Sequence, residues 1–328
     1  MGWQVVIYVI LGLLAFDFLV RLFFAIIILP TFERKPPFGV EPASPHPDAE
    51  QIQFPTNRGL TLRGSLYRHE DQPSRGLIIF GPELDGSHWS VMSYCEGLWN
   101  AGFDLLAFDF RNQGESESMP GYEPIHWLTD YEVQDVHSAI AYKNSRADLR
   151  DLPLGLMGIS RGGAASLAAA ANCPDVKCVA CEGSFAMNDL LFHFALRWAS
   201  IYVPGWLLNV VPIWHFRGTL TLIRLLSQWR RKCRYTLLDR CASQLRKKPF
   251  LMIAGERDSY VVPSVPERFC RRVSGNADSL WVVPNAKHNG ARKVEPEEYD
   301  RRLVNFFLQL TPRTPRCEIS QPQSQAGG

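Results

Sequence analysis

The sequence lacks several features that would place it in other classes of protein. Its formal net charge is only +2 over 328 residues, so it has no overall basicity that would indicate binding to nucleic acid. One C-x-x-C occurs, at Cys178 and Cys181, but no second cysteine pair or nearby histidine completes a zinc site. No segment repeats. Neither nucleic acid nor a structural zinc ion is therefore expected as a partner.

The cysteines are interpreted as buried free thiols in a reducing compartment. Cys178 and Cys181 lie in an apolar run, 176–181, that is predicted as a strand. Side chains three residues apart on a strand point to opposite faces, so these two thiols are not expected to meet. A folded domain of this size does not need disulfides for its stability.

A long apolar run, Val5–Leu29, is predicted to be a transmembrane helix. At about 1.5 Å per residue it can span a bilayer, and Asp17 and Arg21 within it can pair on one helical face. A cleavable secretory signal is disfavoured, because the run is too long and has neither a basic start nor a small-x-small cleavage site. A buried helix of a soluble domain is the other alternative, disfavoured because so little of the run is polar. Arg34 and Lys35 follow the run and no Lys or Arg precedes it, so the positive-inside rule places the following domain in the cytoplasm.

Beyond residue 50 the sequence alternates between strand-like and helix-like patterns. The first two strands are predicted to form a hairpin, and the alternation that follows indicates an α/β fold with a mostly parallel central sheet and helices on both faces. The predicted strands are 51–54, 60–67, 76–80, 104–110, 154–159, 176–181, 250–254 and 280–283, and the predicted helices are 91–102, 130–145, 164–171 and 299–310.

The stretch 158–162 (GISRG) matches the motif G-x-S-x-G around Ser160. An apolar run precedes it and a small-residue helix follows it, which is the strand–turn–helix of a nucleophile elbow. Glycines suit a turn this tight, and Ser160 is expected to have a strained backbone. The alternative is a Gly/Ser-rich turn that has no catalytic role. A hydroxyl is a weak nucleophile at neutral pH, so Ser160 needs a base that an acid orients.

A base and an acid follow in the order that one family uses. His288 lies in a polar loop after the last predicted strand, and Asp258 lies in the loop after strand 250–254. In this order and placement the chain resembles the serine esterases, lipases and peptidases of the α/β-hydrolase superfamily over residues 50–310. Two segments precede these residues: the apolar run Val5–Leu29 and a proline-rich stretch, Pro30–Pro47, that follows it. Together they resemble the N-terminal part of the membrane-bound branch of this superfamily. The resemblance implies a catalytic triad of Ser160, Asp258 and His288, with Glu182 as an alternative acid.

The resemblance also implies two backbone donors for the reaction's oxyanion. One is the N–H of Arg161, directly after the nucleophile. The other lies in the loop 81–86, where family members often carry His-Gly and this chain carries Gly-Pro. Because proline has no N–H, this donor is assigned to Glu83, with Leu84 as the alternative. The stretch 109–116 (DFRNQGES) is similar to the family's Asp-x-Arg-Gly-x-Gly-x-Ser, whose role is structural.

A helical cap is expected between the sixth strand and the strand before Asp258. The segment 185–248 carries eleven Lys or Arg against two Asp or Glu, together with many aromatic residues. Two interpretations remain open: an ordinary cap with an aromatic core and solvated charges, or an apolar, basic-rimmed lid against an anionic bilayer surface. The chain thus divides into a transmembrane anchor (1–30), a Pro-rich linker (31–49), the hydrolase core in two parts (50–184 and 249–311), the cap (185–248) and a disordered tail (312–328).

The expected activity is cleavage of an ester, thioester or amide through an acyl-enzyme on Ser160, at a membrane and without a metal or organic cofactor. The aromatic cap favours a small-molecule substrate with a lipid-like or other apolar acyl group. Three alternatives remain: an acyltransferase that uses the same acyl-enzyme, a serine peptidase, and a non-catalytic binding protein tethered to the membrane.

Overall fold

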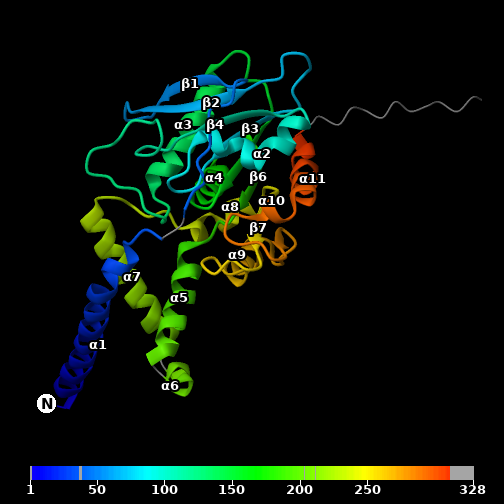
Figure 1. Cartoon of the computed structure of the whole chain (residues 1–328). Coiled ribbons are helices and arrows are strands. Elements are labelled where there is room, and N and C mark those ends of the chain that lie inside the picture. Colours follow the sequence, from blue (N-terminus) through cyan, green and yellow to red (C-terminus); the bar gives the residue numbers. More distant parts are fainter. Residues whose placement is uncertain (1, 37–38, 203, 211, 311–328) are drawn as a thin grey trace, which may run out of the picture.

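The computed structural model describes residues 2–36, 39–202, 204–210 and 212–310. Its centre is an eight-stranded sheet with the strand order β1-β2-β4-β3-β5-β6-β7-β8 (Figure 1). β2 pairs antiparallel with β1 and β4, and every pair from β4 to β8 is parallel, which confirms the predicted mostly parallel sheet. The strands are β1 (Glu50–Pro55), β2 (Thr61–Tyr67), β3 (Leu77–Gly81), β4 (Asp104–Phe108), β5 (Leu154–Ile159), β6 (Val176–Glu182), β7 (Phe250–Gly255) and β8 (Leu280–Val283).

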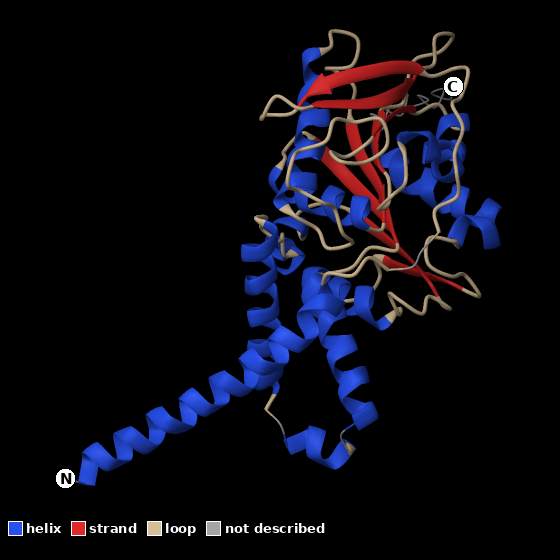
Figure 2. Cartoon of the chain, turned by 60° about the vertical axis from the view of Figure 1, so that its left-hand side comes forward, coloured by secondary structure: helices blue, strands red, loops and turns tan. Residues whose placement is uncertain are grey.

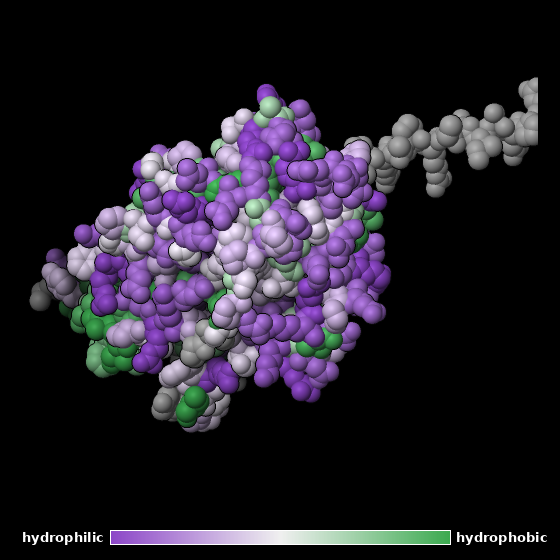
Figure 3. All heavy atoms as spheres, turned by 45° about the horizontal axis from the view of Figure 1, so that its top comes forward, coloured by the Kyte–Doolittle hydropathy of each residue, from purple (hydrophilic) through white to green (hydrophobic). Residues whose placement is uncertain are grey.

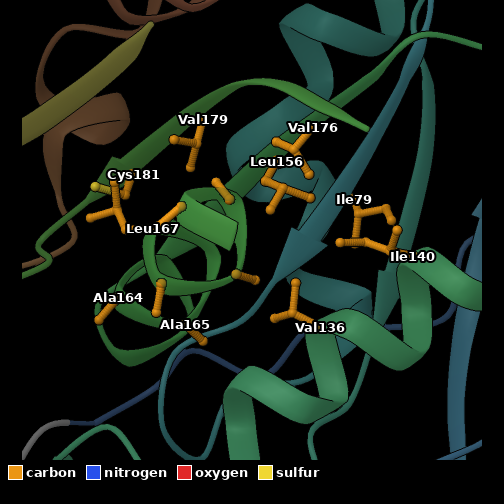
Figure 4. Packing of buried hydrophobic residues seen from close by; sticks show 14 of the residues in the cluster. Ile79, Val136, Ile140, Leu156, Ala164, Ala165, Leu167, Val176, Val179 and Cys181 are labelled. Atoms are coloured by element: carbon orange, nitrogen blue, oxygen red, sulfur yellow. The ribbon is translucent and has the colours of Figure 1, made fainter. Parts of the chain in front are cut away.

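Helices cover both faces of this sheet, as predicted. One apolar layer joins the sheet to α3 and α4, and a second joins its other face to α2 and α11. Figure 4 shows the first layer, in which labelled side chains of α3 and α4 pack beside those of β3, β5 and β6. The helices of the body are α2 (Val91–Asn100), α3 (Asp130–Ser145), α4 (Arg161–Asn172), α8 (Ala242–Leu245), α9 (Ser264–Ser274), α10 (Ala291–Val294) and α11 (Pro296–Phe307), with short 3-10 helices η1 (His88–Ser90), η2 (Leu238–Cys241) and η3 (Leu308–Leu310).

The central strands are apolar apart from Asp104 at the start of β4, and both of their faces are covered. Every residue of β3, β4 and β5 is buried. The small residues of α4 let it lie close to the sheet, and its residues from Arg161 to Ala171 are all buried. Cys178 and Cys181 belong to the apolar layers on opposite faces, as expected from their spacing. All cysteines within the described residues are free.

Besides the short helix α10 and shifts of a few residues at the ends of other elements, two features of the body differ from the prediction. The strand predicted over 104–110 ends at Phe108, because the chain turns where the Asp109 carboxylate accepts the backbone N–H groups of His88 and Glu115. The second is α9, an amphipathic helix between β7 and β8 that the sequence-based prediction did not include.

Two helical arms project from the same side of this body (Figures 1 and 2). One is α1 (Gly2–Phe32), which by length and composition could cross a membrane. The other arm comprises α5 (Met187–Tyr202), α6 (Gly205–Val210) and α7 (Ile213–Arg231), and lies between β6 and β7 within the predicted cap segment. α1 and α7 are in contact. The tail predicted to be disordered, 312–328, lies outside the described residues.

Candidate active site

Ser160 occupies a sharp turn between β5 and α4. Its backbone has φ 50° and ψ −114°, a conformation that is strained for a residue with a side chain. The glycines on either side leave room for this turn. A side chain at Gly158 would meet the backbone N of Gly163 at 2.6 Å, and one at Gly162 would meet the backbone carbonyls of the loop after β3. The structure therefore has the elbow geometry that G-x-S-x-G predicts.

The structure brings Ser160, His288 and Asp258 together in one chain of hydrogen bonds. His288 Nε2 lies 3.2 Å from Ser160 Oγ, and His288 Nδ1 lies 2.6 Å from Asp258 Oδ2. The other oxygen of Asp258 accepts the backbone N–H groups of Tyr260 and Val261, at 2.9 and 2.8 Å. Asp258 is buried, so its carboxylate is held in one orientation facing the imidazole. The three side chains come from loops after β5, β7 and β8, which end at the same edge of the sheet.

Glu182, the alternative acid, has a different partner. It ends β6, is buried, and its Oε1 accepts the backbone N–H of Ala291 at 2.8 Å. Burial raises the pKa of the Glu182 carboxyl to about 7. The geometry therefore favours Asp258 as the group that orients His288.

The loop after β3 lies directly against the elbow. Gly162 has no side chain at the point where the Gly81 and Pro82 carbonyls approach it. Glu83 follows in this loop and lines the same pocket as Ser160 and His288. Its carboxyl is buried and accepts the Tyr94 hydroxyl at 3.2 Å, and burial raises its pKa. Sequence reasoning assigned only a backbone role to Glu83 and gave no sign that its side chain is buried beside the site.

Gln113 links the two residues predicted to supply the oxyanion donors. Its Nε2 donates to the backbone carbonyl of Glu83 at 3.2 Å, and its Oε1 accepts from the guanidinium of Arg161. Arg161 is buried as well, and Nη1 donates to Glu132 Oε1 and the Ile125 carbonyl, both at 3.3 Å. The stretch 109–116 thus fixes the elbow against the loop after β3, a structural role consistent with the resemblance.

A pocket of about 550 Å³ opens over Ser160 and His288. Its walls include the aromatic rings of Phe185 and Tyr260, together with His126, whose pKa burial lowers to about 3. His126 is therefore neutral at pH 7, and its Nδ1 is buried without a hydrogen-bond partner among the described residues. No sequence pattern singled out His126, because its place in the pocket depends on how the loop between β4 and α3 folds.

The linker after α1 also contributes to this pocket. Pro36, Gly39, Val40 and Glu41 lie along its wall, and Glu41 pairs with Lys293. The described part of the chain holds no group of three or more His, Cys, Asp or Glu side chains that could bind a metal ion. The site brings Ser160, His288 and Asp258 together beside an aromatic pocket.

Comparisons with known proteins agree with this fold. The sequence model of the Alpha/beta hydrolase family matches residues 80–301. Over 142 residues the chain is 32% identical to the uncharacterized protein YfhR of Salmonella typhi, covering 42% of this chain and 44% of that one. It is 31% identical over 127 residues to the thiohydrolase aneE of Aspergillus aculeatus, covering 37% and 36%. The match thus spans less than half the length of each of these relatives. The fold superposes on an esterase of Pyrococcus furiosus with a TM-score of 0.61 and 20% identity, over 85% of this chain and 98% of that one.

Proposed function

Because the chain belongs to the alpha/beta hydrolase family, we propose that it is a serine hydrolase that cleaves an ester or thioester of an apolar acyl group. One observation carries this proposal: the hydrogen-bonded series from Ser160 through His288 to Asp258, at 3.2 and 2.6 Å. The thiohydrolase among the relatives and the esterase among the structural neighbours support carbonyl cleavage of this kind.

In the proposed mechanism, Ser160 Oγ attacks the carbonyl carbon while His288 Nε2 takes the hydroxyl proton. Asp258 keeps the imidazole oriented and stabilises its positive charge. The N–H groups of Arg161 and Glu83 stabilise the tetrahedral oxyanion. His288 then passes the proton to the leaving alcohol or thiol, which leaves the acyl group on Ser160. Water attacks this acyl-enzyme with His288 as base, and the acid product departs.

The aromatic pocket and α1 support an apolar substrate at a membrane. Phe185 and Tyr260 line the pocket, and the neutral His126 offers a polar atom without adding charge. α1 could cross a bilayer, and Arg34 and Lys35 directly after it favour a cytoplasmic side for the hydrolase body. We therefore propose a single N-terminal membrane anchor.

Labelling with a fluorophosphonate probe tests the nucleophile. The detergent-solubilised wild type is expected to be labelled, and Ser160→Ala and His288→Ala are expected to lose labelling, because the probe reacts only with an activated serine. Ser93→Ala is the matched control, since Ser93 is an exposed serine in the wall of the same pocket and its loss should leave labelling unchanged. A folded wild type that the probe does not label would contradict the proposal.

Gln113→Leu is expected to lower kcat about 10- to 100-fold with a smaller change in KM. Gln113 touches both residues that supply the proposed oxyanion donors, and these donors act mainly in the transition state. Steady-state kinetics on a chromogenic ester measure both constants. Gln113→Glu keeps the acceptor for Arg161 but loses the donor to Glu83, so its kcat should lie between those of wild type and Gln113→Leu. A raised KM with unchanged kcat would show instead that Gln113 acts on substrate binding.

A further inference from the structure

The far end of the cap arm is an uncharged apolar tip. Between Arg197 and Arg217 the sequence contains no Lys, Arg, Asp or Glu, and we call the segment Trp198–Phe216 the cap tip. Six large apolar side chains of this tip are each between 55% and 70% exposed. They are Trp198, Ile201, Trp206, Val210, Ile213 and Trp214. Apolar side chains exposed together in this way mark a surface that another phase or molecule covers.

The cap tip lies beside the part of α1 that carries its charges. Asp17 and Arg21 pair at 2.5 Å, and Asp17 Oδ1 lies 2.9 Å from His215 Nδ1. The Arg21 guanidinium stacks over the ring of Trp214 at 4.7 Å, and Gly218 leaves the space that Arg21 fills. Charged residues within a bilayer are tolerated where they find partners of this kind. The two arms therefore meet at a small group of polar contacts around Asp17 and Arg21, beside the apolar surface of the cap tip.

Basic residues at the end of α7 and at the end of the cap segment lie near the hydrolase body, whereas Arg197 and Arg217 flank the cap tip. Arg230 pairs with Glu33 at 2.9 Å, and Arg231 donates to the Glu123 carbonyl. Lys248 donates to backbone carbonyls on the body at 2.6 and 2.8 Å. Arg230 and Arg231 hold the end of α7 to Glu33 and to the body, and the cap tip itself contains no charged residue, so the surface that it offers is apolar. Figure 3 shows a largely hydrophilic body whose hydrophobic surface gathers at the edge where the two arms project.

We propose that the cap tip is inserted into the apolar layer of the same bilayer that α1 enters. Both arms project from one side of the body and diverge toward their ends, so a single bilayer can receive both (Figures 1 and 2). Tryptophan at positions 198, 206 and 214 suits the boundary between headgroups and acyl chains. The inference rests on the proposed function only in taking α1 as a membrane anchor. It gives the hydrolase a second membrane contact, with lipid acyl chains as the partner.

Fluorescence quenching on the full chain in phosphatidylcholine vesicles tests this insertion. Single cysteines replace Val210 in the tip, Leu11 in α1 and Glu70 on the body, all of which are exposed, and each carries an environment-sensitive fluorophore. The label at Val210 is expected to lose fluorescence to acyl-chain spin-labelled lipid and to resist aqueous iodide, as the label at Leu11 does. The label at Glu70 should do the reverse. The wild-type chain, labelled with the same fluorophore, gives the background signal from its native cysteines.

The quenching results at Val210 and Leu11 test the insertion of the cap tip and of α1 independently. Iodide quenching at Val210 with lipid quenching at Leu11 would overturn insertion of the cap tip and leave the anchor in place. Iodide quenching at both positions would show that α1 itself is outside the bilayer. Protection of Val210 from both quenchers would mean that protein covers the tip, for example a second copy of the chain, and would also overturn the proposal.

Discussion

Replacement of Asp258 by asparagine is expected to lower kcat for ester hydrolysis about 10⁴-fold while the protein stays folded. The two side chains have nearly the same shape, so packing is retained. The backbone N–H groups of Tyr260 and Val261 need an acceptor, so the amide oxygen of the asparagine will face them. Its NH2 group then faces His288 Nδ1 and leaves the ring proton on Nε2, where the imidazole cannot accept the proton of Ser160. Steady-state kinetics on a chromogenic ester measure kcat of the wild type and the variant, and thermal unfolding of both proteins shows whether the variant stays folded.

Glu182→Gln is the matched control for this variant. Glutamine keeps the shape of Glu182 and an oxygen that can accept the N–H of Ala291. Since burial already raises the pKa of Glu182 to about 7, a neutral side chain resembles one of its native protonation states. Activity within about tenfold of wild type is expected, because Glu182 is not the group on His288 Nδ1. A large loss in Glu182→Gln with little loss in Asp258→Asn would move the catalytic acid to the end of β6.

The parts of the fold that the sequence predicts well are those fixed by local pattern. β5 and β8 both have the predicted bounds. β5 is fully buried, and a buried parallel strand appears in the sequence as an unbroken apolar run, whereas β8 is a partly exposed strand that the same apolar pattern identifies. α3 also has its predicted bounds, and Thr129 with Glu132 forms a capping box at its start. The elbow at Ser160 could be predicted for the same reason, since its strained turn needs glycine at fixed neighbouring positions.

α9 had a local signal that the prediction did not use. Val265, Phe269 and Val273 recur every four residues and are all buried, which is the spacing of a helix with one apolar face. The segment is short and rich in charge, so its mean composition resembles a loop. The periodicity of its apolar residues, and not their number, identifies it.

The contacts that complete the site and the cap had no local signal. Gln113 is 30 residues from Glu83 and 48 from Arg161 in sequence, and only the folded sheet brings them together. The pairing of Asp17 with Arg21 follows from helical spacing, but its contact with His215 joins residues 198 positions apart. Spacing along the chain predicts neighbours on one element, whereas these contacts depend on how separate elements pack.

Asp135→Ala is expected to lower the free energy of unfolding by about 3–5 kcal/mol. Arg111 and Asp135 form a fully buried ion pair, in which Nη2 lies 2.6 Å and Nε 3.0 Å from Oδ1. Asp135 Oδ2 also accepts the backbone N–H of Arg111 at 3.0 Å. Alanine would leave a buried guanidinium and a buried N–H without this acceptor, and both losses act on the folded state. Denaturant unfolding of the variant and wild type in the same detergent measures the difference.

Two comparisons show whether the lower stability of Asp135→Ala comes from the buried, unpaired guanidinium of Arg111. The double variant Arg111→Met with Asp135→Leu removes both charges, so it is expected to be more stable than Asp135→Ala alone, because no charge remains buried without a partner. Glu267→Ala breaks the exposed pair with Arg271 on α9, which measures 2.8 Å, and should cost less than about 1 kcal/mol because water screens it. If Asp135→Ala were no more destabilising than Glu267→Ala, the stretch 109–116 would not depend on its buried ion pair. The structural role assigned to that stretch would then have to rest on Asp109 and Gln113, which hold the loops around the elbow.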